Sequence, residues 1–431
     1  MSFIADQQTL DDLNLLGKYR QHSIFSIFNK VRTSGGERLL DEMFRHPFTD
    51  YESINSRAAI FQYFQNKQVN FPFDPEMLTV VGNYLSSGGS GSYFGSLTMW
   101  AQIKAARTVL RDERYDGLKA GLAATVSVLR LAKELAMSIE IPAATVIRTI
   151  FADPRLNWLS GSENGSCSLS QMARHDLLFR HVLRREMAAI MDFISETDVF
   201  IAVGGVARER GFTFATALPA SMNLLKATAI SHPGLSNGVA NPLRLDHQTN
   251  LLFLTGANMA GKSTFMKSFG IAVYLAHMGF PVAAGDMEFS VLEGLFSSIN
   301  VSDSLNQGYS HFYAEVRRVK KVAEEVSNGR NLMVLFDELF KGTNVKDAYD
   351  ATLACTSAFS KYKNCFFIIS THITEVGDAL RSDHGHVRFA FMPTVMNGVT
   401  PVYTYLLTEG ITADRHGMVL IGNEGIVEML E

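Results

Sequence analysis

The C-terminal half of the chain alternates short apolar runs with stretches of helical periodicity. Apolar runs at 251–255, 332–336 and 365–370 have the length and composition of buried strands. An earlier segment, Phe212–Ala217, alternates in the way of a half-buried strand. Strands that alternate with helices along a sequence are typical of a mainly parallel sheet, so we predict an α/β domain in this half.

The N-terminal half has helical periodicity instead. Ile24, Ile27 and Phe28 fall on one face of a helix. Two segments, Ser34–Glu37 and Thr49–Glu52, fit the capping box, and an apolar stripe follows each of them. Both segments therefore predict the start of a helix.

Proline, glycine and polar clusters divide the rest of the helical pattern. Long helices are expected at 118–150, with a break near Pro142, and at 174–210. Loops are expected at 83–96 and 161–168. The pattern changes after Gly211, which predicts two domains, an all-helical one at 1–211 and an α/β one at 212–431.

Composition narrows the class of protein. With 431 residues, 47% of them hydrophobic and 19% charged, the chain has the composition of a soluble protein of two or three domains. A net charge of −4 argues against a surface that is basic throughout, but a local basic groove for nucleic acid stays open. No membrane span or export signal is visible, and the three cysteines have no metal spacing, so we expect a cytoplasmic protein.

The loop after the first apolar run fits G-x-x-x-x-G-K-[ST], the phosphate-binding loop. Its two glycines allow a tight turn and a close approach to an anion, and amides at the start of the following helix attract phosphate oxygens. Lys262 can reach the β- and γ-phosphates, and the Ser263 hydroxyl can bind Mg²⁺. The residues expected to bind the nucleotide are Gly256, Ala257, Asn258, Met259, Ala260, Gly261, Lys262, Ser263 and Thr264.

The run at 332–336 ends in two acids, Asp337 and Glu338. We expect its strand to lie beside the phosphate loop, where Asp337 would hold the Mg²⁺ ion through water. Glu338 would then act as general base on the attacking water. Two acids at a strand end are a weak signal alone, since they are often merely solvated, and gain weight from the loop upstream.

Two further features have both a functional and a structural interpretation. His372 follows the strand at 365–370, where it could contact the γ-phosphate or the attacking water, or simply bond to a neighbour. Arg180, His181, Arg184 and Arg185 form a basic cluster. A solvated helix face is the first interpretation of that cluster, and a phosphate contact is the second.

Several of these segments resemble MutS-type ATPases. Gly256–Thr264 is similar to the family's phosphate loop through its Asn-Met pair, with Ala257 and Ala260 where the family has proline and glycine. Asp337–Thr343 resembles the family's Asp-Glu-x-x-x-Gly-Thr, and Ser370–His372 its Ala-Thr-His switch. The resemblance implies an ABC-type P-loop ATPase domain that uses ATP and Mg²⁺.

The resemblance also implies a homodimer with shared sites. Asp303–Glu315 is similar to the family's signature segment, and Ser310 matches its serine, which reaches the nucleotide of the opposing subunit. The tail from Gly410 to Leu430 resembles the start of a helical dimerisation element. Segments near 13–55 and 174–209 resemble the family's helical core, so the N-terminal domain is expected to be a core and lever domain.

The chain departs from the family pattern in three respects. Core-like sequence begins by Leu13, so we expect no mismatch-reading domain before it. The middle segment, roughly 71–170, is not aligned with the family and is short for long arms ending in a DNA clamp. Gly238 stands where the family has an aromatic residue that stacks on adenine.

The leading hypothesis is therefore a dimeric MutS-like ATPase that couples ATP binding and hydrolysis to conformational change on DNA, without reading mismatches itself. One alternative is a nucleotide-gated scaffold that binds no DNA. Another is a small-molecule phosphotransferase that uses the same loop. The pair of acids favours water as the acceptor over a small molecule, and product analysis would separate the two.

Overall fold

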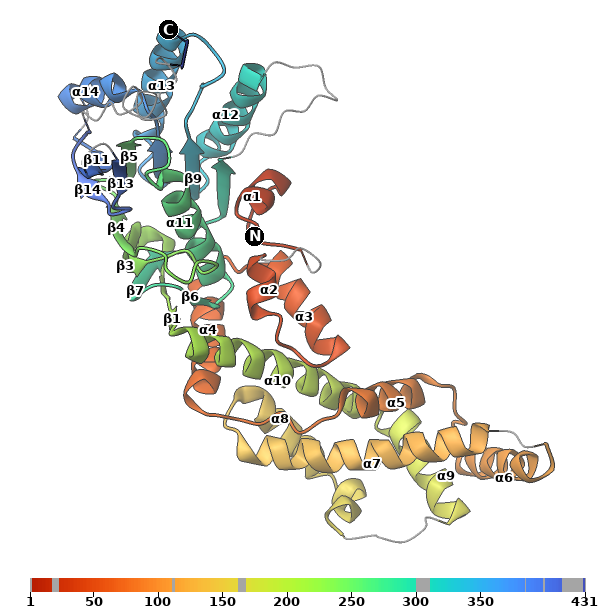
Figure 1. The fold of residues 1–431 in the computed structure, drawn as a ribbon. Coiled ribbons are helices and arrows are strands. Elements are labelled where there is room, and N and C mark those ends of the chain that lie inside the picture. Colours follow the sequence, from red (N-terminus) through yellow and green to blue (C-terminus); the bar gives the residue numbers. More distant parts are fainter. Residues whose placement is uncertain are drawn as a thin grey trace. The chain divides into compact units, whose positions relative to one another are not determined.

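The computed structural model describes residues 2–17, 23–110, 113–161, 168–299, 311–383, 385–397, 400–412 and 429–430. The chain divides into two compact units. The first comprises Met1–Phe28, Glu42–Asn66 and Val203–Glu431, and the second comprises Asn29–Asp41 and Lys67–Ala202. The N-terminal part is helical and the C-terminal part contains the sheets (Figure 1). The domain boundary predicted near Gly211 divides the chain once along the sequence, whereas each compact unit combines separate segments. The boundary stays a prediction.

The second unit is built from helices in the part that the structure describes. Its α-helices are most of α3 (Ser34–Arg45), α5 (Pro75–Ser86), α6 (Tyr93–Leu110), α7 (Arg114–Ser138), α8 (Pro142–Phe151), α9 (Leu169–Leu177) and most of α10 (Arg184–Arg210). The expected break near Pro142 is confirmed, because α7 ends at Ser138 and Pro142 begins α8. The expected loop at 83–96 is too long, since α5 runs to Ser86 and α6 begins at Tyr93.

Both predicted capping boxes are wrong by one residue. Helix α3 (Ser34–Arg45) is capped by Thr33, whose hydroxyl accepts from the Gly36 amide at 2.9 Å. The carboxylate of Asp198 in turn accepts from the Thr33 amide at 2.7 Å. Helix α4 (Tyr51–Asn66) is capped by Asp50. Neighbouring polar residues offer equivalent caps in sequence, and contacts distant along the chain, such as that of Asp198, decide between them.

The basic cluster has a structural role at Arg180. This side chain is buried, and it donates to Asp176 Oδ1 at 2.9 Å and to the carbonyl of Ser87 at 3.0 Å. It therefore closes the turn between α5 and α6, and its interpretation as a solvated residue is wrong. Arg184 and Arg185 are exposed, as that interpretation expects.

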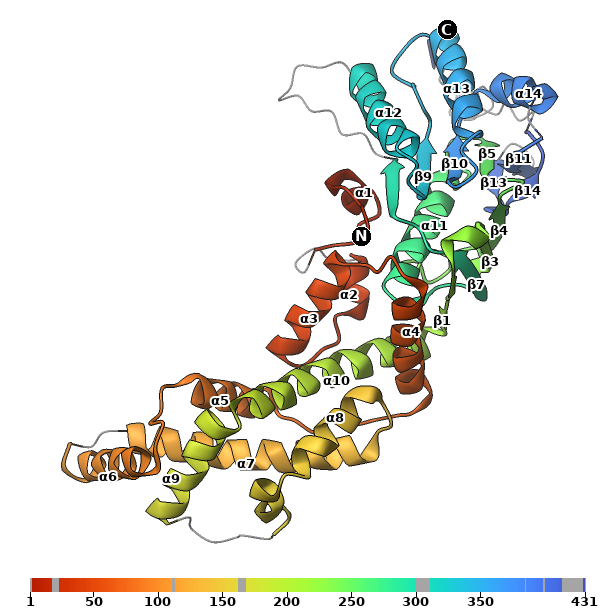
Figure 2. The same ribbon diagram turned by 180° about the vertical axis from the view of Figure 1, so that it is seen from behind.

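The first unit contains a six-stranded sheet of order β14-β11-β5-β10-β9-β8. Neighbouring strands from β11 to β8 are parallel, and β14 is antiparallel to β11. The strands are β5 (Leu251–Gly256), β8 (Gly294–Ser298), β9 (Leu332–Asp337), β10 (Phe366–Ser370), β11 (Val387–Met392) and β14 (Thr408–Glu409). The strand that ends in Asp337 was expected beside the phosphate loop, but β10 lies between β9 and β5 (Figure 2). Apolar periodicity predicts that a strand is buried and does not specify its neighbours.

Three smaller sheets make the strand pairing of this unit mixed. They join β1 (Thr213–Phe214) with β6 (Pro281–Val282), then β2 (Thr216–Leu218), β7 (Asp286–Ser290), β3 (Leu224–Ile230) and β4 (Asn241–Asp246), and finally β12 (Thr394–Asn397) with β13 (Thr400–Tyr403). Among their pairings β2 with β7 is parallel, and the others are antiparallel. The segment predicted as a strand at Phe212–Ala217 is divided between β1 and β2.

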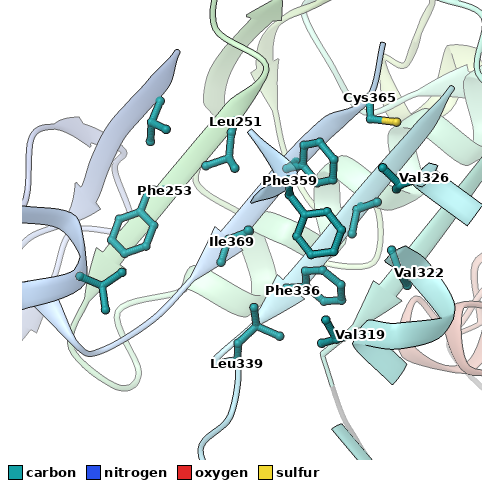
Figure 3. Packing of buried hydrophobic residues seen from close by; sticks show 14 of the residues in the cluster. Leu251, Phe253, Val319, Val322, Val326, Phe336, Leu339, Phe359, Cys365 and Ile369 are labelled. Carbon is teal, nitrogen blue, oxygen red and sulfur yellow. The ribbon is translucent and has the colours of Figure 1, made fainter. Parts of the chain in front are cut away.

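Helices cover both faces of the six-stranded sheet. One face packs against α12 (His311–Ser327), α13 (Val345–Phe359) and α14 (Thr374–Asp383). Phe253, Phe336 and Ile369 from three strands meet Val322 and Phe359 in this core (Figure 3). Strand residues of alternate parity point to the other face, so both faces of these strands are apolar.

Helix α11 (Lys262–His277), which follows the phosphate loop, lies on the opposite face. It packs so closely that a Cβ atom on Gly270 would lie 2.7 Å from Leu335 Cδ1. Nearly all of its residues are buried. No described helix is long and apolar enough to span a bilayer.

His277 at the end of α11 is fully buried between two backbone groups. Its Nδ1 lies 2.9 Å from the carbonyl of Phe48, and its Nε2 accepts from the Leu292 amide at 3.3 Å. These two partners require the neutral tautomer with the proton on Nδ1. Burial lowers the pKa of His277 to about 4, although the Phe48 carbonyl acts in the other direction.

Acid is expected to destabilise the first unit through His277. The folded-state pKa lies below the ordinary value of 6.5, so the neutral form stabilises the fold above pH 6.5, and this contribution is lost as the pH falls toward 4. The loss for His277 alone is about 3 kcal/mol between pH 7 and pH 4. Urea unfolding of the wild type and of His277→Gln at both pH values measures it. An equal loss of stability in the two proteins would contradict the assignment.

Candidate functional site

The loop between β5 and α11 has the backbone shape of an anion cradle. Gly256, Met259 and Gly261 have φ values of +142°, +69° and +102°. A Cβ atom on Gly256 would lie 3.1 Å from the carbonyl oxygen of Met392, and one on Gly261 would lie 2.9 Å from the ring of Tyr405. Both glycines are therefore required for backbone conformation and for space.

One departure from the family's loop pattern, Ala260, fits this shape. Ala260 is buried, does not have a positive φ, and donates its amide to the Ala257 carbonyl at 3.2 Å. A glycine is thus unnecessary at position 260. Asn258 and Met259 are exposed at the tip of the loop.

Lys262 links the loop to the acids at the end of β9. Its side chain is 5% exposed, and Nζ donates to the carbonyls of Gly256 at 2.9 Å and Ala257 at 3.2 Å. The same Nζ lies 3.9 Å from Glu338 Oε1. Burial lowers the pKa of Lys262, and the carboxylates of Glu338 and Asp337 counteract part of that effect.

The sheet register explains how these groups meet. Leu254 pairs with Ser370, and Ser370 pairs with Asp337, so β9 and β10 end side by side and β5 continues two residues further to Gly256. The residues that follow them leave the sheet at the same edge, where parallel α/β sheets place their sites. The Ser370 hydroxyl donates to Asp337 Oδ1, and the Glu338 amide donates to the Ser370 carbonyl at 3.0 Å.

Glu338 has a strained backbone, with φ of +53°. Non-glycine residues seldom adopt this conformation, and those that do are frequent in functional sites. In this conformation the Glu338 amide bonds to the Ser370 carbonyl, and the Glu338 carboxylate lies 3.9 Å from Lys262 Nζ. The sequence predicted the role of this residue but gave no indication of the strain.

The two residues predicted to bind Mg²⁺ carry side-chain oxygen atoms, which are the ligand type that this ion prefers. Ser263 lies in the first turn of α11, and Asp337 ends β9, with both side chains partly accessible. Among the described residues, no three or more His, Cys, Asp or Glu side chains gather as a metal site. A Mg²⁺ ion held here would therefore take its other ligands from phosphate and water, as this ion commonly does.

Of the other two predicted catalytic residues, the structure describes one. His372 follows β10 at the same sheet edge, and its side chain is exposed. Ser310 lies outside the described residues, as does most of the tail from Gly410 to Leu430. The roles of His372 and Ser310 remain predictions.

A cavity of about 280 Å³ opens beside the phosphate loop. Its lining includes His232, Gly238, Gly261, Thr264 and Tyr405. Gly238 was identified from the sequence, whereas His232 and Tyr405 were not, since neither belongs to a motif. The fold brings them to the loop from distant parts of the chain.

Asn241 fixes the segment that contains Tyr405. Its side-chain amide donates to the Tyr405 carbonyl at 2.9 Å, and its Oδ1 accepts from the Leu407 amide at 2.6 Å. Asn241 itself is buried. The aromatic side of the cavity is therefore held by a polar residue that lies in the same short segment as Gly238.

Comparison with protein families covers most of the chain. The model of MutS domain III matches residues 8–203, and the model of MutS domain V matches residues 252–428. The chain belongs to the MutS family. The domain III match includes the stretch 71–170, which the sequence motifs alone did not align, and the domain V match begins at the strand before the phosphate loop.

Proposed function

We propose that this chain is a MutS-type ATPase that couples ATP binding and hydrolysis, as a homodimer, to conformational change on DNA. The observation that carries the proposal is the meeting of Lys262 and Glu338 at 3.9 Å, on a sheet edge shared by the phosphate loop, Asp337 and His372. The match to domain V, the ATPase domain of the family, supports the same chemistry.

Each group at this edge has a role in ATP hydrolysis. The loop amides and the start of α11 would bind the phosphates, with Lys262 compensating the charge of the β- and γ-phosphates. Ser263 and Asp337 would hold Mg²⁺, which neutralises charge on the phosphate oxygens. Glu338 would accept a proton from the water that attacks the γ-phosphorus, as the bond to the ADP oxygen breaks. His372 would contact the γ-phosphate or this water.

The cavity beside the loop is our candidate for the base and sugar of the nucleotide. Gly238 supplies no ring, but Tyr405 and His232 face the same cavity and can present aromatic surfaces. Burial, and then the charge of Lys267, lowers the pKa of His232, which favours a neutral ring. Because Tyr405 lines the same cavity as Gly238, its ring can stack on the base in place of an aromatic residue at position 238.

We propose a homodimer because Asp303–Glu315 resembles the signature segment of the family. Ser310 of one subunit would complete the ATP site of its partner, so that hydrolysis requires two chains. The rate per chain should then rise with protein concentration and reach a plateau. A rate per chain that is constant down to concentrations at which the protein is monomeric would defeat the shared-site part of the proposal.

DNA is the proposed partner because the family acts in DNA repair. Binding to homoduplex, mismatched and branched DNA should be measured with and without ATP across a salt series. We expect affinity to fall steeply as salt rises, since phosphate contacts release counterions. Failure to bind any of these DNAs at low salt would favour the nucleotide-gated scaffold over the DNA-bound ATPase.

A further inference from the structure

One wall of the cavity beside the phosphate loop is a tight turn between β3 and β4. The turn comprises residues 232–235, and the Leu235 amide closes it by donating to the His232 carbonyl at 3.0 Å. His232 and Leu235 both line the cavity. We name this segment the cavity turn. It lies outside the phosphate-loop motif, and local sequence patterns assign it no role.

The surrounding fold holds the cavity turn at two points. The Ser231 amide, directly before the turn, donates to the Ala283 carbonyl at 2.9 Å. Within the turn, the Pro233 carbonyl accepts from Arg210 Nη1 at 2.8 Å. Arg210 is the last residue of α10, and its guanidinium also lies over the Phe212 ring, 6.0 Å from the ring centre. The protein alone makes these contacts, so they shape the turn independently of any ligand.

The tautomer of His232 follows from its place in the cavity turn. Its Nδ1 accepts from the Gly234 amide at 3.1 Å. A neutral imidazole whose Nδ1 accepts a hydrogen bond must carry its proton on Nε2. Burial, and then the charge of Lys267, lowers the pKa of the ring, which favours this neutral form. A Cβ atom on Gly234 would lie 3.2 Å from His232 Cε1, so the turn packs closely against this edge of the ring.

The Nε2–H group of His232 is a hydrogen-bond donor on the side of the ring away from Gly234. The ring is half-buried and lines the cavity. Its Nδ1 meets the Gly234 amide, and the two nitrogens of an imidazole point to different sides of the ring. In the part of the chain that the structure describes, no residue accepts a hydrogen bond from Nε2. This donor is therefore available to a ligand in the cavity.

Much of the remaining cavity wall is apolar or already hydrogen-bonded within the protein. Ile230 and Phe265 contribute apolar side chains. Asn241 is buried, and its amide donates to the carbonyls of Val239 at 3.3 Å and Tyr405 at 2.9 Å. An apolar cavity with a few polar groups at fixed positions is typical of a site for a small organic ligand. The imidazole donor is one of these few groups, and its direction is fixed by the cavity turn.

The cavity continues from the site predicted for the phosphates. Its lining includes Gly261, the second glycine of the loop, and Thr264, in the first turn of α11. A nucleotide whose phosphates bind the loop would therefore extend its nucleoside toward the cavity turn. We propose that His232 determines nucleotide specificity, with its Nε2–H donating to an acceptor of the nucleoside, either a base nitrogen or a ribose hydroxyl. This inference rests on the proposed function.

Two substitutions of His232 separate a contact to the nucleotide from support of the turn. Asparagine places its side-chain oxygen near the position of Nδ1, so His232→Asn can still accept from the Gly234 amide but lacks the donor at Nε2. Glutamine places its amide nitrogen near the position of Nε2, so His232→Gln keeps the donor and lacks the acceptor. We expect His232→Asn to bind ADP about 5-fold more weakly than the wild type, and His232→Gln to stay within about 2-fold.

Titration calorimetry with ADP and Mg²⁺ measures these affinities, because ADP contains the nucleoside of ATP and is not hydrolysed. His386→Asn is the matched control and should bind ADP like the wild type, since His386 is exposed and does not line the cavity. A greater loss of affinity in His232→Gln than in His232→Asn would show that the ring only supports the turn, and it would overturn the proposal. Equal affinities of the two variants would overturn it as well.

ATP hydrolysis provides a second readout of the same contact. A bond to the nucleoside should act equally on bound ATP and on the transition state, because the reaction takes place at the γ-phosphorus. His232→Asn should therefore raise the KM for ATP about 5-fold and leave kcat unchanged. A lower kcat with an unchanged KM would contradict a contact to the nucleoside.

Analogues of ADP identify the acceptor atom. The deaza forms each lack one nitrogen of the base, and the deoxy forms each lack one ribose hydroxyl. The wild type should bind one of these analogues about 5-fold more weakly than ADP, and His232→Asn should bind that analogue as well as the wild type does. If His232→Asn weakens the binding of every analogue, neither a base nitrogen nor a ribose hydroxyl is the acceptor, and the proposal fails.

Lys262→Met distinguishes failure of this inference from failure of the proposed function. If this variant binds ADP far more weakly than the wild type, the nucleotide occupies the predicted loop, and the His232 variants then decide the inference alone. If it binds ADP like the wild type, the nucleotide does not occupy this loop. The proposed function and the inference about His232 would then fail together.

Discussion

Replacing Glu338 by glutamine is expected to slow ATP hydrolysis by about 100-fold or more and to leave ATP binding within a few-fold of the wild type. The amide has the shape of the carboxylate but cannot accept a proton from water. It also keeps the backbone bond to Ser370 that is present in the strained conformation at position 338. The effect should therefore appear in kcat. Steady-state ATPase assays and equilibrium binding of ATP measure the two quantities.

The same chemical change at an exposed acid provides the control. Glu375 lies in the first turn of α14 with an exposed side chain, and Glu375→Gln should hydrolyse ATP at the wild-type rate. Normal turnover by Glu338→Gln would contradict the assignment of the general base. Loss of ATP binding in that variant would instead indicate that Glu338 supports the loop through Lys262.

Lys262→Met is expected to abolish the stabilisation that ATP and Mg²⁺ give to the protein. Methionine retains the length and the apolar stem of lysine while removing the charge that would meet the phosphates. ATP at about 100 times its Kd should raise the stability of the wild type by about 2.7 kcal/mol, and the variant should show almost none of this gain. Urea unfolding with and without nucleotide measures the difference.

Without nucleotide, the same variant should have nearly the stability of the wild type. Removal of the buried Lys262 ammonium relieves its desolvation cost, and this gain offsets the lost hydrogen bonds to the carbonyls of Gly256 and Ala257. Lys320→Met, at a position 74% exposed on α12, is the control and should respond to ATP like the wild type. A full ATP response by Lys262→Met would show that nucleotide binds somewhere other than this loop.

The residue types at the candidate site could be predicted from the sequence because their chemistry requires a fixed local spacing. The glycines of the loop, the lysine that follows and the acids at the end of β9 are recognisable without a fold. Their separations in space could not be predicted. The order β5-β10-β9 places the strand before His372 in the centre, and nothing in the apolar runs themselves specifies that order.

Other features depend on contacts between distant segments, which is why sequence patterns missed them. Thr33 caps α3 with the help of Asp198, which is 165 residues away. Arg180 belongs to a basic run but is buried against Asp176. Tyr405 lines the cavity beside the loop although it lies far from the loop in sequence. Asp6 bonds to Arg318, which is more than 300 residues away in sequence. Each pairing is a property of the folded chain, whereas motifs describe neighbours in sequence.

The shared ATP site is the central claim, and mixing two inactive variants tests it most directly. Ser310→Ala should be inactive because it fails to complete the partner's site, and Lys262→Met because its own loop cannot bind ATP. An equal mixture of the two should regain about a quarter of wild-type ATPase activity, since each mixed dimer contains one intact site. Inactive mixed dimers, once their formation is verified, would contradict the shared site. Normal ATP hydrolysis by Ser310→Ala alone would contradict it as well.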